Sequence, residues 1–68
     1  MKATIQLAGG EEIVVDGLTK IKYGSEDGLA EVTVWDNFLF YSNCCYIFIG
    51  SITFTTWGKN ILFVKFEN

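Results

Sequence analysis

Residues 46–56, YIFIGSITFTT, decide which fold this 68-residue chain can adopt. The even-numbered positions from Tyr46 to Phe54 form an apolar row that only Gly50 interrupts, and this period of two is typical of one face of a β-strand. Their odd-numbered positions are apolar before Gly50 and polar after it. We therefore predict one strand that is covered on both faces in its first half and on one face in its second, with a bend at Gly50.

Toward the amino terminus, the same alternation predicts a hairpin. Residues 2–8 alternate polar and apolar side chains, as a half-buried strand does. Gly9-Gly10 can adopt the positive φ angles of a tight turn. We expect residues 11–15 to return from this turn as the second strand.

The next part of the chain is more polar. Asp16-Gly17 predicts a turn, and the short strand after it directs Lys20 and Lys22 to water. Residues 24–28, GSEDG, contain two glycines and no apolar residue, so we expect a solvated turn there.

Two further strands are expected before the central stretch. Residues 29–35 alternate again, in a phase that places Trp35 on the polar face. Asp36-Asn37 can close a two-residue hairpin into residues 38–42, FLFYS, which we predict to be a strand.

The remaining segments complete the pattern. We expect a turn at residues 42–44, a second turn at residues 57–60, and a last strand over residues 61–67 whose even-numbered side chains point inward.

These segments together predict the fold class. No ten-residue window has the 3.6-residue period of an amphipathic helix, and proline is absent. We predict a single all-β domain over residues 1–68, with about six short antiparallel strands in a meander. The meander would form a small barrel or a strongly bent sheet of the SH3-like or Sm-like kind.

The charged residues exclude several classes of function. The chain has five lysines, eight acidic residues, no arginine, no histidine and a formal net charge of −3. It therefore lacks the usual neutral-pH general base, the commonest metal ligand and the basic face of a nucleic-acid binder. We expect no enzymatic activity, no metal and no cofactor, and we do not expect nucleic acid as the partner.

Cys44 and Cys45 are adjacent, which does not suit the geometry of a common disulfide. We expect two free thiols and a reducing, cytoplasmic setting. The alternative, a redox pair or soft-metal site, lacks the further Cys or His ligands of a tetrahedral zinc site. No apolar run reaches the roughly 18 residues of a membrane span, so we expect no membrane insertion.

The chain is 50% hydrophobic, which is more apolar surface than one small core needs. The surplus side chains predict an interface formed by Trp35, Phe40, Tyr41, Ile47, Ile49, Ile61 and Phe63. Identical chains that pair sheet-on-sheet or edge-to-edge would cover it, so the expected partner is a second copy. The alternative is that the chain wraps its own terminal strands over this surface.

Two functional hypotheses follow. The first is a small, non-catalytic protein-protein interaction module, dimeric or larger, that binds another protein with its acidic side or an open sheet edge. An accessory protein or inhibitor from a bacterium or phage would suit this description. The second is a small-barrel oligonucleotide binder that stacks bases on Trp35, Phe38, Tyr41 or Trp57. It requires a basic groove, for which five lysines are few.

Overall fold

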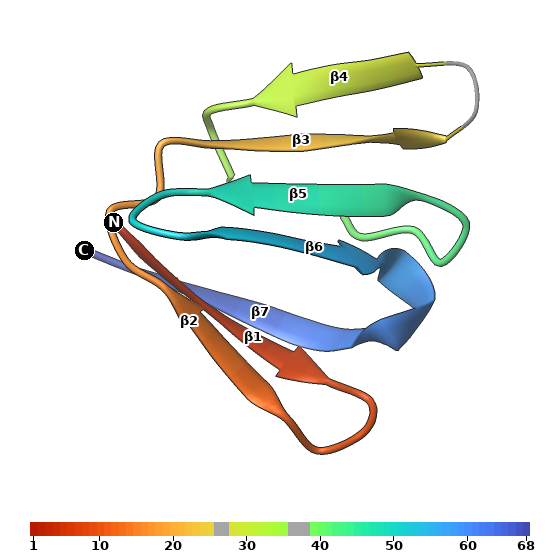
Figure 1. Ribbon diagram of the computed structural model, residues 1–68, viewed down its shortest axis with the longest axis horizontal. Coiled ribbons are helices and arrows are strands. Elements are labelled where there is room, and N and C mark those ends of the chain that lie inside the picture. The colour runs from red at the N-terminus through yellow and green to blue at the C-terminus, as the bar shows by residue number, and fades with distance from the viewer. Residues whose placement is uncertain (26–27, 36–38) are drawn as a thin grey trace.

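A computed structural model describes residues 1–25, 28–35 and 39–68. These residues form seven β-strands and one short 3-10 helix, η1 (Gly58–Asn60) (Figure 1). The strands are β1 (Lys2–Leu7), β2 (Glu12–Val15), β3 (Lys20–Ser25), β4 (Gly28–Val32), β5 (Cys45–Ile49), β6 (Thr53–Trp57) and β7 (Ile61–Glu67). The predicted all-β class is confirmed.

The strands form two antiparallel sheets, with the orders β2-β1-β7 and β4-β3-β5-β6. In Figure 1 the four-stranded sheet lies above the three-stranded one, and the chain passes between them after β2 and through η1. No ladder joins the two sheets among the described strands. The two-sheet architecture is therefore established, whereas the closed barrel stays a prediction.

One hydrophobic core joins the two sheets. Its fully or nearly buried side chains are Ala3, Ile5, Val15, Leu18, Ile21, Tyr46 and Phe48. Half-buried residues from both sheets pack against this cluster, among them Phe54, Val64 and Phe66. The inward face predicted for residues 2–8 is confirmed by the complete burial of Ala3 and Ile5.

The amino-terminal hairpin and its turns agree with the sequence. β1 pairs with β2 in the antiparallel register Ala3↔Val15, and the turn between them contains Gly10 at a φ of 93°. Gly17 turns the chain out of the hairpin at a φ of 61°. In the predicted turn at residues 24–28, Ser25 pairs with Gly28, while residues 26–27 lie outside the described part of the chain.

The single strand predicted for residues 46–56 is wrong, because the chain reverses at Gly50. β5 ends at Ile49, β6 begins at Thr53, and the two strands pair as a hairpin with Phe48 opposite Phe54. The Gly50 N–H donates to the Ile52 carbonyl oxygen at 2.9 Å. The even-numbered apolar row is consequently split between two strands, and Ile52 lies exposed in the turn.

The last strand has the predicted bounds, and Val64 and Phe66 pack against the core as predicted, but the faces of Ile61 and Leu62 are exchanged. The register against β1 shifts between Gln6, opposite Phe63, and Leu7, opposite Ile61, so Leu62 is the extra residue of a β-bulge. The bulge reverses the alternation locally. Ile61 packs against the core, and Leu62, expected inside, is exposed.

The connection between β4 and β5 contains the largest departures from the predicted meander. β5 pairs with β3 rather than with β4. In Figure 1 β4 ends at the left of the view and β5 begins at the right, so the two strands are not joined by a tight hairpin. The strand predicted for residues 38–42 is wrong where it is described, because residues 39–41 have no regular structure and 42–44 form the expected turn. The predicted hairpin at residues 36–37 lies outside the described residues.

Candidate functional site

An apolar groove of about 390 Å³ lies beside the last strand. We call it the aromatic groove. Its lining residues are Trp35, Leu39 and Phe40, from the connection between β4 and β5, and Ile61, Leu62, Phe63, Val64 and Phe66, from β7. None of these side chains is charged, and polar backbone atoms share the lining with the apolar side chains.

One wall of the aromatic groove is a pair of stacked rings. The rings of Trp35 and Phe66 lie 5.4 Å apart at an interplanar angle of 11°. Trp35 packs against the core, so its predicted place on the polar face of a strand is wrong. The reason is that β4 ends at Val32 and the strand alternation ends with it. The indole Nε1–H is buried and meets no hydrogen-bond acceptor among the described residues.

Phe40 anchors the other wall to the core. Its ring lies 4.9 Å from the ring of Tyr46 and 6.0 Å from that of Phe48. The neighbouring Tyr41 N–H donates to the Tyr46 hydroxyl oxygen at 2.6 Å. Gly58 fits closely against this segment, since a Cβ atom there would overlap the Tyr41 carbonyl oxygen. The irregular connection is therefore held by specific packing.

The Tyr46 phenol is fully buried beneath this connection. Burial raises its pKa above the usual value of 10.0, because the charged phenolate would lose its contact with water. The hydrogen bond from the Tyr41 N–H acts in the opposite direction, and the nearby Cys44 adds to the rise. Tyr46 thus stays a neutral packing residue at physiological pH.

The seven residues predicted to form an interface do not lie in one place. Trp35, Phe40, Ile61 and Phe63 line the aromatic groove. The first three of these pack against the core, as expected if the chain covers part of its own surface, while Phe63 is 57% exposed.

The other three predicted residues lie elsewhere. Tyr41 is exposed beside the groove. Ile47 and Ile49 lie on the outer face of the four-stranded sheet, where Ile47 stands between Lys22 and Thr55.

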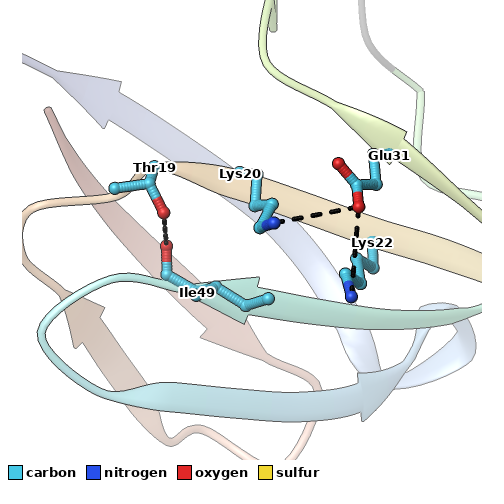
Figure 2. Close-up of polar contacts among 5 residues, drawn as sticks. All are labelled: Thr19, Lys20, Lys22, Glu31 and Ile49. Atoms are coloured by element: carbon cyan, nitrogen blue, oxygen red, sulfur yellow. Dashed lines mark hydrogen bonds and ion pairs between the residues drawn. The ribbon is translucent and has the colours of Figure 1, made fainter.

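The outer face of the four-stranded sheet also holds a small charge cluster (Figure 2). The Glu31 carboxylate on β4 lies 3.8 Å from the Lys20 ammonium and 4.0 Å from that of Lys22. The Thr19 hydroxyl donates to the Ile49 carbonyl oxygen at 3.1 Å. One carboxylate thus lies between two lysine side chains on this face.

Two further lysines lie beside a glutamate, and the two cysteines are not joined to each other. Lys2 and Lys65 each lie 3.9 Å from Glu67. Cys44 and Cys45 carry free thiols and are half-buried. No group of three or more Cys, Asp or Glu side chains that could hold a metal ion occurs in the described ranges.

Four lining residues of the groove do not belong to the interface predicted from the sequence, namely Leu39, Leu62, Val64 and Phe66. Leu62 was expected to be buried, and only the bulge exposes it. Phe66 was expected to point inward, and no periodicity indicates that Trp35 would lie on its ring. Leu39, 61% exposed, belongs to a segment that was expected to be a strand.

No known protein family, curated protein or solved structure matches the chain. In the part of the chain that the structure describes, no helix has the length and apolar character needed to cross a lipid bilayer.

Proposed function

We propose that this protein is a small, non-catalytic interaction module that self-associates through the aromatic groove. The observation that carries the proposal is the groove itself, a hollow whose described lining has no charged side chain and whose rim has protruding apolar side chains. Leu39, Leu62 and Phe63 are 61%, 63% and 57% exposed there. Apolar surface concentrated in this way is typical of a site that another protein covers.

A second copy is the occupant that this surface suits best. In a two-fold dimer the same patch meets itself, so the patch has to contain both a protrusion and a hollow. The bulge at Leu62 and the neighbouring Phe63 supply the protrusion, and the space beside Trp35 and Phe40 supplies the hollow. Each copy would thus insert its apolar side chains into the groove of the other.

The same proposal includes a partly open small barrel of the SH3-like or Sm-like kind in a reducing, cytoplasmic setting. The pairing of the first strand with the last supports this architecture. So does the Ser51 N–H, which donates to the Asp16 carbonyl oxygen at 2.8 Å and ties the β5–β6 turn to the end of β2.

The test is the solution mass over a concentration series, measured by sedimentation or light scattering. We expect the wild-type chain to form a dimer or a larger closed oligomer. The substitution Phe63→Glu places a charge in the apolar contact and should weaken association at least about tenfold, which equals about 1.4 kcal/mol.

Leu29→Glu is the matched control, because Leu29 is 55% exposed on β4 and outside the groove. It should associate like the wild type, and circular dichroism should show the same fold for both variants. A monomeric wild type, or a Phe63→Glu variant that associates normally, would refute the groove as an interface.

A further inference from the structure

One sheet edge lacks the protection that the other edges have. The edge strands of the two described sheets are β2, β4, β6 and β7. Charged residues, prolines and bulges normally prevent an exposed edge from pairing with another chain. β2 carries Glu12 and β4 carries Glu31. β7 carries Lys65 and Glu67 as well as a bulge. β6, with the sequence TFTTW, has no charge, and its register against β5 is regular.

The register determines which backbone groups of β6 face outward. The Thr19 N–H donates to the Ile49 carbonyl oxygen, so the polar backbone groups of Ile49 face β3. Successive residues of a strand direct these groups to opposite sides. Those of Phe48 therefore face β6, and those of its partner Phe54 face back toward β5.

By the same alternation, Thr53, Thr55 and Trp57 direct their N–H and C=O groups away from β5. The next residue fits this order, since the Gly58 N–H donates to the Cys44 carbonyl oxygen at 2.7 Å. Among the described strands, none pairs with the outer side of β6. Three residues thus offer donors and acceptors to an incoming strand.

We propose that β6 pairs antiparallel with β6 of a second copy, about a two-fold axis at Thr55. This pairing places Thr55 opposite the partner's Thr55 and Thr53 opposite the partner's Trp57. The two four-stranded sheets would then become one continuous sheet across the dimer.

The side chains of β6 favour this occupant over a foreign strand. The large Trp57, 49% exposed, would lie across from a small threonine, and two threonines would meet at the axis. An edge without charge has no means of selecting a foreign partner by charge complementarity. A two-fold pairing needs only a strand whose shape and hydrogen-bonding groups are complementary to those of a second copy of the same strand.

The inference rests on the proposed self-association but names a different surface. No residue of the aromatic groove belongs to β6. A substitution in β6 and a substitution in the aromatic groove therefore test different contacts between the copies.

The first experiment is cysteine cross-linking in a chain whose Cys44 and Cys45 are replaced by serine. Residues opposite each other in a hydrogen-bonded antiparallel pair have Cα atoms about 5.5 Å apart, and a disulfide can span that distance. Thr55→Cys should give a disulfide-linked dimer under mild oxidation, as seen on a non-reducing gel. Thr53→Cys, the matched control, should not, because it faces a tryptophan. Equal cross-linking of both variants, or of neither, would overturn the proposed register.

The second experiment separates the edge from the groove. Thr55→Pro removes an outward N–H and leaves the ladder to β5 intact, because proline is tolerated where the N–H of an edge strand faces solvent. The variant should keep its circular dichroism spectrum and associate at least tenfold more weakly. If Thr55→Pro associates normally while Phe63→Glu does not, the edge pairing is refuted and the groove stands. If only Thr55→Pro fails to associate, the edge pairing stands and the groove is refuted.

Discussion

The hydroxyl of Tyr46 connects the irregular segment before β5 to the core. It accepts a hydrogen bond from the Tyr41 N–H, so Tyr46→Phe would leave a partly buried donor without its acceptor. We expect a loss of about 1–3 kcal/mol in the free energy of unfolding at pH 7. Tyr41→Phe, at an exposed ring, is the matched control and should cost much less.

The same residue predicts a pH dependence. The pKa of Tyr46 is raised in the folded chain, so its contribution to stability is complete below pH 10. Above that pH the unfolded chain loses the phenolic proton first, and stability falls as the pH approaches the folded pKa. Urea titrations between pH 9 and pH 11.5 should show a steeper decline for the wild type than for Tyr46→Phe, and parallel declines would contradict the burial of this hydroxyl.

Trp35 permits a test of its indole N–H, which meets no acceptor among the described residues. Trp35→Phe would keep a ring on Phe66 and remove the buried donor, so we expect it to lie within about 1 kcal/mol of the wild type. Trp35→Ala would remove the ring contact and should cost about 2 kcal/mol or more. Thermal unfolding compares the variants. A Trp35→Phe variant as unstable as Trp35→Ala would show that the N–H has an acceptor in solution.

Among the elements, the β5–β6 hairpin depends on the close approach of Gly50 to the end of β2. A Cβ atom at this position would lie 2.9 Å from Cγ1 of Val15 and press on the Asp16 carbonyl oxygen. Gly50→Ala should therefore destabilise the chain by about 1–3 kcal/mol. Gly9→Ala is the control, since a Cβ there has no neighbour within 4 Å. Chemical denaturation measures both, and an equal effect would contradict the packing of this turn.

At this scale, the sequence predicts strands better than reversals. The period of two identified β1, β2 and β7 almost to the residue, because each has one face in the core. It does not distinguish a bend at Gly50 from a hairpin, since Tyr46, Phe48 and Phe54 keep their inward phase in either case. The sequence does not indicate the bulge at Leu62 either. Residues 61–64 are all apolar, so no change in the polar-apolar alternation marks the extra residue.

For the whole molecule, the all-β class could be predicted and the strand order could not. A meander requires strands that are neighbours in the sequence to pair with each other. In the structure, β5 pairs with β3 and not with β4, which precedes it in the sequence. Trp35 and Phe40, which belong to the connection between β4 and β5, are partly buried against the core. The aromatic groove arises where that connection meets β7, so its lining could not be read from either segment alone.

The pairing of β1 with β7 also bears on how the protein is made. β1 is the central strand of its sheet, and one of its two neighbours is formed by Ile61–Glu67. During synthesis, one side of β1 therefore stays unpaired until residues 61–67 have left the ribosome. Until β7 is available, the open side of β1 is accessible to a chaperone or to a neighbouring nascent chain.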